Sequence, residues 1–327
     1  EQAKSNRGIP VPAQSWKLGD YLDYWLEQVI RPTRRPATYA QYEMVVRVHL
    51  KPGLGKHPLK RLSVPTVQTF LNKQLQAGRS VRNVQIMRQI LRSALSRAMR
   101  EELVVRNVAQ LADLPGWEPP SITPWSSAEA TAFLRASATD PLAAAFVLLV
   151  LYGMRRGEVL GLRWQDIDSD AKLIRVRQQV QRVQGELHIG PVKTRAGKRD
   201  LPVLSLALAQ LDSRKQDQDQ DRANLGSAWP DLDLVFTTRT GRPIEPRNFV
   251  RSFTRICEQN AIRRISVHAV RHTTASLLKD LKVPPRDAQV ILGHANFTTT
   301  QQIYTHVDEA ARLDALTRLN KLLGGEG

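Results

Sequence analysis

The sequence predicts a mainly α-helical protein with a small antiparallel β-sheet, that is, an α+β fold in two domains. Apolar residues recur with helical spacing from about residue 16 to 114, whereas later stretches rich in Ile, Val and Arg are typical of strands. Between these regions, prolines cluster around Gly116, as expected of an interdomain linker. At 327 residues the chain has room for two cores, since one domain takes roughly 100 to 200 residues. We therefore expect a tail or linker, a helical domain, a linker and a second domain at residues 1–14, 15–114, 115–124 and 125–327.

The charge balance indicates a polyanionic partner. The formal net charge is +17 and the pI is about 10.5, and a positive field of that size attracts phosphates. Nucleic acid is the first candidate and an anionic membrane surface the second. The longest apolar run, 142–154, is shorter than the roughly 20 residues that cross a bilayer, so we expect no membrane insertion. Cys257 is the only cysteine, which excludes an internal disulfide and fits a reducing compartment.

Four helices are expected in the first domain. Two span about 18–30 and 38–50, and a third begins after Ser63, a suitable N-cap, with Pro65 in its first turn. The fourth covers about 80–102 and has the clearest apolar face. The residues of that face are Val84, Met87, Ile90, Leu91, Ala94, Leu95 and Ala98.

The opposite face of the fourth helix carries Arg82, Arg92, Arg97 and Arg100. The alternative is an ordinary solvated basic face, because runs of charge are usually solvated. Residues 15–118, however, hold 17 Lys and Arg against 8 Asp and Glu, a net charge of +9. Acidic residues are nearly absent from this face, so we expect the four arginines to bind DNA phosphates.

The second domain is expected to mix helices with strands. A first helix, capped by Ser126 or Ser127, is followed by a helix over 142–152 that is apolar all round and therefore buried. Strands are expected at 172–183, 187–193 and 199–203. A helix over 204–211 is expected to be followed by a polar stretch without periodicity over 212–228, either an exposed loop or the end of that helix. The last helices are expected to begin at 246, 267, 285, 298 and 307.

The turn after the buried helix carries the first candidate site residues. In L-Y-G-M-R-R-G-E, Gly153 ends the helix, and Arg155, Arg156 and Glu158 begin the next one. A cation placed directly after a buried helix is held on a rigid support. The alternative is an ordinary surface arginine, since most arginines are exposed.

Two further motifs supply a lysine and histidines. Lys193 lies in G-P-V-K-T-R-A-G-K-R, at an expected hairpin turn, from which a lysine can reach a phosphate and protonate a leaving oxygen. Many hairpin lysines have no such role. In V-H-A-V-R-H-T-T, His268 and Arg271 are three residues apart on a helix, so both can face one phosphate.

A zinc site is the alternative for the histidines, because His268 and His272 are spaced as in H-E-x-x-H motifs. Ala269 stands where that motif has its glutamate, and no cysteine or carboxylate cluster completes a ligand set. We therefore expect no metal, and a packing or hydrogen-bonding role for His272.

The last motif, L-G-H-A-N-F-T-T-T-Q-Q-I-Y, contains His294 and, ten residues later, Tyr304. A tyrosine hydroxyl has a pKa of about 10. It acts as a nucleophile only where a neighbouring group takes its proton and cations stabilise the charge that develops on the group it attacks. The arginines, lysine and histidines upstream are the candidates for these roles.

Taken in order, these motifs resemble those of the tyrosine recombinase (phage integrase) family, and the resemblance covers almost the whole chain. Y-G-M-R-R-G-E is similar to the family's first arginine box, V-K-T-R to its hairpin lysine, H-A-V-R-H-T to its H-x-x-R box, and L-G-H with I-Y-T-H to its last histidine and nucleophile. The front half, from W-K-L-G-D to N-V-A-Q, resembles the core-binding domain of actinobacterial and phage integrases. Residues 1–14 are too few for the small arm-binding domain of many such integrases, which we expect to be lacking or removed.

The resemblance implies an all-helical, SAM-like core-binding domain followed by a tyrosine-recombinase catalytic domain, working without metal, ATP or another cofactor. Tyr304 would attack the scissile phosphate, forming a 3′-phosphotyrosyl link and releasing a 5′-hydroxyl. Arg155 and Arg271 would hold the non-bridging oxygens. Lys193 would protonate the 5′-oxygen, and His268 would assist proton transfer at the tyrosine.

Two further roles follow from the same resemblance. His294 would hydrogen-bond the phosphate, and Glu158 would orient Arg155. Arg155 is preferred to Arg156 because the family's box places its arginine two residues after the glycine, and Arg156 is expected to face solvent or DNA.

The expected partner is double-stranded DNA carrying attachment or recombination sites, bound by a homotetramer in the bacterial cytoplasm together with accessory DNA-bending or directionality factors. An apolar stripe on the last expected helix packs either on its own domain or on a neighbouring protomer; its residues are Val307, Ala310, Ala311, Leu316, Leu319 and Leu323. Two alternatives remain: a type IB topoisomerase-like relaxing enzyme, and a catalytically silent DNA-binding relative. The silent relative is disfavoured because all six catalytic positions hold competent residues.

Overall fold

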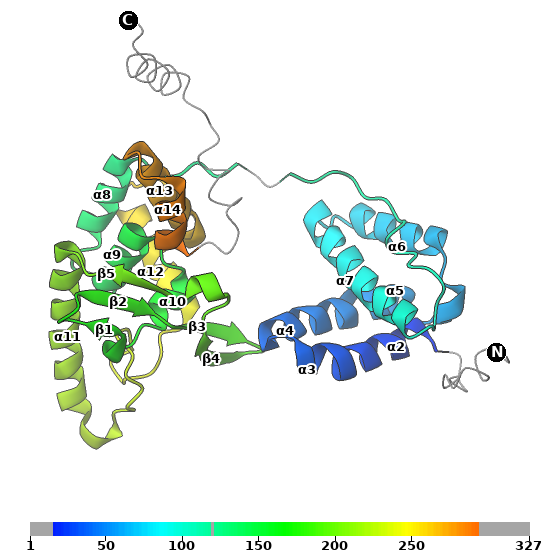
Figure 1. Cartoon of the computed structure of the whole chain (residues 1–327), viewed down its shortest axis with the longest axis horizontal. Helices are drawn as coiled ribbons and strands as arrows, with labels where there is room; N and C mark the ends of the chain where they lie inside the picture. The colour runs from blue at the N-terminus through cyan, green and yellow to red at the C-terminus, as the bar shows by residue number, and fades with distance from the viewer. Residues whose placement is uncertain (1–15, 119–120, 294–327) are drawn as a thin grey trace, which may run out of the picture. The chain divides into compact units, whose positions relative to one another are not determined.

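The computed structural model of the chain describes residues 16–118 and 121–293 (Figure 1). The chain divides into two compact units, Glu1–Pro120 and Ser121–Gly327, and the division falls within the proline-rich segment 115–124. Each unit has an apolar core of its own. His294, Tyr304 and the helices expected at 298 and 307 lie outside the described residues.

The described part of the first unit, coloured blue to cyan in Figure 1, is entirely helical. Its first elements are short helical segments, most of which follow one another without a break, and α6 and α7 are separate helices. The first two predicted helices are confirmed, and each includes a π-helical turn. Pro36 begins the second one two residues earlier than predicted, because proline suits the first helical turn. In chain order the elements are α2 (Leu18–Tyr24), η1 (Trp25–Ile30), α3 (Arg31–Thr33), α4 (Pro36–Val45), η2 (Val46–Leu50), α5 (Lys51–Leu54), η3 (Leu59–Arg61), α6 (Val64–Gln76) and α7 (Val81–Arg100).

The predicted caps and the apolar face of this unit are confirmed. Ser63 Oγ accepts a hydrogen bond from Thr66 N at the start of α6, and Ser80 Oγ accepts one from Asn83 N at the start of α7, both at 3.3 Å. All seven apolar residues predicted for the inner face of α7 are buried. Their burial places α7 against the other helices of the unit, in one shared core.

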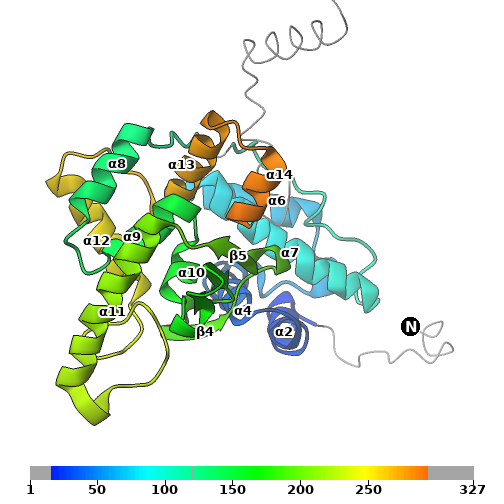
Figure 2. The same ribbon diagram turned by 60° about the vertical axis from the view of Figure 1, so that its left-hand side comes forward.

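The second unit is built around α9 (Ala143–Tyr152), the helix predicted to be buried. Every residue of α9 except Leu151 is buried. It is contacted by helices from before and after it in the chain (Figure 2). These helices are α8 (Ser127–Ala136), α10 (Arg156–Leu160), α11 (Ser205–Leu225) and α13 (Val267–Asp280).

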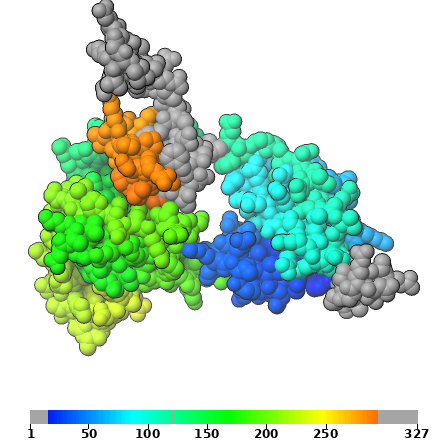
Figure 3. All heavy atoms as spheres, in the orientation of Figure 1, coloured from blue at the N-terminus to red at the C-terminus, as the bar shows by residue number. Residues whose placement is uncertain are grey.

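The other helix starts predicted for this unit within residues 121–293 are confirmed as well. Ser126 caps α8 in a reciprocal arrangement: Glu129 N donates to Ser126 Oγ at 3.2 Å, and Ser126 N donates to Glu129 Oε2 at 2.7 Å. Helices α12 (Pro246–Gln259) and α14 (Pro285–Leu292) begin where predicted. Helices α13 and α14 contribute the orange surface in Figure 3.

The strands are antiparallel, as predicted, but they form two sheets instead of one. The first sheet has the order β1 (Ile167–Asp168), β2 (Leu173–Val176), β5 (Arg199–Pro202), and the second is the hairpin of β3 (Gln178–Val183) and β4 (Glu186–Pro191). The predicted strand 172–183 breaks at Arg177, because Val176 pairs with Arg199 while Gln178 pairs with Pro191. The loop 192–198 connects β4 of the second sheet to β5 of the first. Within it, Val192 N donates a hydrogen bond to Arg177 O at 3.2 Å.

Of the two alternatives for 212–228, the helix end is confirmed and the loop is wrong, because α11 continues to Leu225. Its buried stripe is spaced as in a helix, but half of it is polar: Ala207, Leu211, Arg214 and Gln218. Arg214 Nε donates to Val235 O at 3.0 Å, and Gln218 Nε2 donates to Leu234 O at 3.0 Å. These side chains satisfy backbone carbonyls of 234–237, so the helix is stabilised by hydrogen bonds that apolar periodicity does not reveal.

In the described part of the chain, no helix combines the length and apolar character needed to cross a membrane.

Helix α9 ends at Gly153, whose φ of +57° lies in the left-handed region. A Cβ atom added there would lie 2.6 Å from Leu292 Cδ2 and 3.2 Å from Thr274 Cβ. The end of α9 is therefore packed directly against α13 and α14.

Replacing Gly153 by alanine should lower the free energy of unfolding of the second unit by about 2 to 4 kcal/mol, from left-handed backbone strain plus overpacking. Urea unfolding followed by tryptophan fluorescence measures this. Gly185→Ala is the matched control, since Gly185 also has a positive φ of +88° but nothing lies within 4 Å of an added Cβ. Equal losses in the two variants would contradict the role of close packing at Gly153.

Candidate active site

The carbonyl groups at the end of α9 anchor the helix that carries the H-x-x-R motif. The last carbonyls of a helix lack intrahelical partners. Two side chains of α13 fill this role: Thr274 Oγ1 donates to Val150 O and Arg271 Nη1 donates to Gly153 O, both at 2.8 Å. Arg271 is buried, with 4% of its surface exposed. The helix bearing His268 and Arg271 is thereby fixed to the turn that bears Arg155.

Arg155 occupies the N-cap position of α10 and is held by Glu158. Its backbone N donates to Glu158 Oε2 at 3.0 Å, and its Nη1 donates to Glu158 Oε1 at 2.6 Å. Its Nη2 donates to Gly293 O at 3.2 Å. The Glu158 side chain is only 1% exposed, whereas that of Arg155 is 28% exposed. A buried carboxylate thus holds a guanidinium that reaches the surface.

Glu158 has a second cationic partner, Arg199, at the start of β5. Arg199 Nη2 lies 3.0 Å from Glu158 Oε2, and its side chain is 3% exposed. Burial disfavours the ionised carboxyl, but the charges of Arg199 and Arg155 outweigh it and hold the pKa of Glu158 below its ordinary value. Glu158 is therefore ionised at neutral pH.

The cluster as a whole carries more positive than negative charge. Burial first, and then the nearby charges of Arg155 and Arg199, lower the pKa of Arg271 to about 9, which leaves it protonated at neutral pH. One carboxylate thus faces three guanidinium groups. The surplus charge favours binding of an anion at this place.

The two histidines of α13 contact each other edge to face, with ring centroids 5.9 Å apart. Burial, then the charges of His272, Arg271 and Arg155, lower the pKa of His268, which is therefore neutral at pH 7 and able to accept a proton. Burial and Arg271 also lower the pKa of His272. Within residues 16–118 and 121–293, no three His, Cys, Asp or Glu side chains are grouped to share a metal ion.

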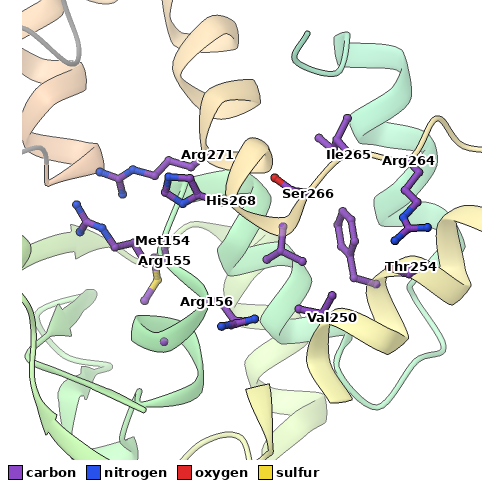
Figure 4. Close-up of a pocket in the computed structure, with 13 residues that line it drawn as sticks. Met154, Arg155, Arg156, Val250, Thr254, Arg264, Ile265, Ser266, His268 and Arg271 are labelled. Atoms are coloured by element: carbon purple, nitrogen blue, oxygen red, sulfur yellow. The ribbon is translucent and has the colours of Figure 1, made fainter. Parts of the chain in front are cut away.

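Arg155, His268 and Arg271 meet at one end of a pocket of about 680 Å³. Figure 4 shows their side chains lying together, whereas Arg156 points away from Arg155 toward another part of the pocket. The remaining lining is largely apolar and comes from the turn after α9, from α12 and from the segment that leads into α13. The lining residues outside the cationic end are Met154, Arg156, Gly157, Val250, Phe253, Thr254, Arg264, Ile265, Ser266 and Val267.

One predicted catalytic residue of the described part of the chain, Lys193, lies outside this pocket and is exposed. It also lies two residues beyond β4, in the loop that connects the two sheets, rather than at the strand end of a hairpin turn as predicted. His294 and Tyr304 lie outside the described residues.

Comparison with known proteins identifies the family. Residues 126–311 match the model of the phage integrase family, and residues 17–75 match that of the phage integrase N-terminal SAM-like domain. The chain belongs to the phage integrase family. Members of this family are tyrosine-type site-specific recombinases.

Curated relatives are similar over most of the chain. A tyrosine recombinase XerC-like protein of Caldanaerobacter subterraneus subsp. tengcongensis is 28% identical over 96% of this chain and 85% of its own length. An integrase of Streptomyces ambofaciens is 27% identical over 91% of this chain and 78% of its own length.

Solved structures show the same fold at lower identity. The Tn1549 transposon integrase, in complex with a circular intermediate DNA, matches with a TM-score of 0.77 and 21% identity, covering 93% of this chain and all of that one. A lambda integrase tetramer bound to a Holliday junction matches with a TM-score of 0.63 and 18% identity, covering 93% of this chain and 82% of that one.

In the first unit of this integrase, the four predicted DNA-contact arginines differ in their surroundings. Arg82, Arg92 and Arg100 are exposed, whereas Arg97 is partly buried. Arg82 lies over the Trp117 ring, 5.0 Å from its centroid. Arg97 Nε donates to Glu101 Oε1 at 2.6 Å, so the view that acids are nearly absent beside these arginines does not hold for Arg97. Its i, i+4 spacing to Glu101 was visible in the sequence.

The main residue that sequence reasoning missed is Arg199, which was assigned only to a strand. A signal existed: Arg199 and Leu201 alternate with exposed residues in β5, so an arginine stands on the buried face. Arg264 and Thr254 of the pocket lining were also missed, and no local motif indicates them.

Replacing Glu158 by glutamine should lower the free energy of unfolding at pH 7 by about 3 kcal/mol, because Arg155 and Arg199 lose their carboxylate. The wild-type advantage is fully present above the ordinary pKa of 4.5 and disappears as the pH falls through the lower folded-state value. Urea unfolding of both proteins from about pH 7 to about pH 3 measures the difference. A difference that stays constant over this range would show that the Glu158 charge is not what stabilises the site.

Proposed function

We propose that this integrase cleaves and rejoins DNA strands through a covalent 3′-phosphotyrosyl intermediate at Tyr304, without metal or ATP. The observation that carries the proposal is the meeting of Arg155, Arg271 and His268 at one end of a pocket, with a surplus of buried positive charge. A phosphodiester is an anion that such a cluster binds. Its negative charge must be stabilised as the phosphorus is attacked, and fixed guanidinium groups do so without reorganising.

The two arginines would take the non-bridging oxygens of the scissile phosphate. Arg155 is oriented by Glu158 and is partly exposed, so its guanidinium is available to a ligand while its direction is fixed. Arg271 is fixed by its bond to Gly153 O. Both therefore present charge from rigid supports, which lowers the entropy lost on reaching the transition state.

The proton transfers are assigned to groups around these arginines. Neutral His268 would assist removal of the Tyr304 proton as the tyrosine oxygen attacks phosphorus, and Lys193 would protonate the 5′-oxygen as its bond to phosphorus breaks. His294 would hydrogen-bond the phosphate. The 5′-hydroxyl of another strand can then attack the phosphotyrosine and reverse the step, so no external energy source is required.

Double-stranded DNA with specific recombination sites is the proposed substrate, and a homotetramer in the bacterial cytoplasm is the proposed working form, with accessory bending or directionality factors. The Tn1549 and lambda integrase structures, which contain DNA, support this proposal by likeness of fold. In the first unit the exposed Arg92 and Arg100 are the proposed phosphate contacts, with a smaller contribution from Arg82 and Arg97, which have partners within the unit.

Replacing Tyr304 by phenylalanine should abolish covalent attachment to DNA and leave DNA binding intact. A cleavage site is first selected: nicked duplexes of random sequence are incubated with the wild type, and the duplexes that become covalently attached are isolated and sequenced. One of these sequences is the selected site for all later experiments. Tryptic digestion and mass spectrometry should then identify a nucleotide-bearing peptide containing Tyr304. An adduct formed by the Tyr304→Phe variant, or on another residue of the wild type, would refute the assignment.

Replacing Lys193 by alanine should slow cleavage of the selected site by roughly 100-fold or more, a typical cost of losing a general acid. A 5′-bridging phosphorothiolate has a leaving group that needs no protonation, so this substrate should restore the rate. Lys198→Ala, in the same exposed loop, is the matched control and should cleave both substrates like the wild type. If the phosphorothiolate fails to rescue Lys193→Ala, another residue is the general acid.

A further inference from the structure

Arg199 lies beneath the cationic pocket and donates hydrogen bonds from all three of its guanidinium nitrogens. Nη2 donates to Glu158 Oε2 at 3.0 Å, Nε donates to Ile291 O at 2.8 Å, and Nη1 donates to Gly197 O at 3.1 Å. Its side chain is 3% exposed, and it is not among the residues that line the pocket. Arg199 is therefore placed to act on other residues and not on a ligand.

The three acceptors belong to three segments that each carry a proposed catalytic residue. Glu158 holds Arg155. Gly197 lies in the loop 192–198, which carries Lys193. Ile291 is near the end of α14, three residues before His294. One guanidinium thus connects segments that are distant in the chain.

The packing around Arg199 is close enough to fix these segments relative to one another. A Cβ atom added at Gly293 would lie 2.7 Å from Ala196 O and 3.0 Å from Arg199 Nη1. Gly293 O also accepts a hydrogen bond from Arg155 Nη2 at 3.2 Å. The loop 192–198, the end of α14 and Arg155 therefore meet around the Arg199 side chain.

A buried arginine is a costly way to fill space. Burial lowers the pKa of Arg199, and the charge of Glu158 and the hydrogen bond to it oppose this effect. Apolar residues of similar volume often stabilise a protein as well as a buried ion pair does. What an apolar side chain lacks is directional bonds to three acceptors at once, which define geometry.

We propose that Arg199 is a positioning residue for strand cleavage, which holds the Glu158–Arg155 pair, the Lys193 loop and the end of α14 in register. The inference rests on the proposed phosphotyrosyl chemistry. It extends that chemistry by assigning the alignment of separate catalytic segments to one residue that does not touch the DNA.

The test compares Arg199→Met with wild type on the selected nicked duplex in three forms: natural, with a 5′-bridging phosphorothiolate, and with a neutral methylphosphonate at the scissile position. On natural DNA, Arg199→Met should form the adduct roughly 100-fold more slowly than wild type, because a small misplacement of reacting groups has an effect of this size. Its affinity for DNA should be unchanged. The deficit should shrink on the phosphorothiolate, which does not need Lys193. The deficit should also shrink on the methylphosphonate, because this neutral group has no negative charge for Arg155 to stabilise.

Arg214→Met is the matched control, since Arg214 is a buried arginine that also donates to backbone carbonyls, in α11. It should lower the melting temperature without a deficit that depends on the substrate. Arg199→Lys keeps a cation beside Glu158 but cannot reach three separate acceptors, so it should recover only part of the rate. If Arg199→Met does not fold, the double variant with Glu158→Gln removes both charges and is compared with Glu158→Gln alone. The additional loss of rate should show the same substrate dependence.

The outcomes separate this inference from the proposed function. If wild type forms the adduct and Arg199→Met matches its rate, or shows an equal deficit on all three substrates, Arg199 is not a positioning residue. If the deficit shrinks only on the phosphorothiolate, Arg199 positions the Lys193 loop alone. If it shrinks only on the methylphosphonate, Arg199 positions the Glu158–Arg155 pair alone. If wild type forms no adduct, the phosphotyrosyl chemistry itself fails.

Discussion

The buried carboxylate of Glu158 is the constraint on which the candidate active site depends. A charge in a nearly dry interior is tolerated only when it is paired and hydrogen-bonded, and Glu158 is paired with both Arg155 and Arg199. Because both guanidinium groups must converge on one side chain, the start of α10 and the start of β5 are held at defined positions. The single negative charge of Glu158 does not balance the positive charges around it, since Arg271 adds a third cation nearby. The site thus combines rigid cations with an excess of positive charge toward the pocket.

Helix ends supply the rigidity of this arrangement. Helix α9 is apolar on all sides and lies in the core, so its final carbonyls have little access to water. Thr274 and Arg271 satisfy two of the carbonyls at that end, which docks α13 on the turn that carries Arg155. Glu158 satisfies the first backbone N–H of the following turn in the same way. The hydrogen bonds that complete the helix ends therefore also align the residues of the site.

Elements with local signals were predictable, and those whose stability comes from distant partners were not. The apolar face of α7 and the caps at Ser63, Ser80 and Ser126 follow from spacing and residue type within one or two turns. The sequence did not decide between loop and helix for the second half of α11, because half of its buried stripe is polar and the acceptors of those polar side chains lie in 234–237. The strands were predicted, but their division into two sheets depends on which partner each one meets on either side of Arg177.

The sequence by itself determined the family and the order of its domains, and it predicted the candidate catalytic residues, because each motif is a short run whose chemistry can be interpreted without its surroundings. It also determined the turn that presents Arg155, since a buried helix that ends in glycine directs the next residues outward. Only the tertiary structure decided which cations share a carboxylate: Arg199, not the adjacent Arg156, joins Arg155 at Glu158. That choice depends on a strand and a helix start 41 positions apart meeting in the core, and local spacing carries no information on such a contact.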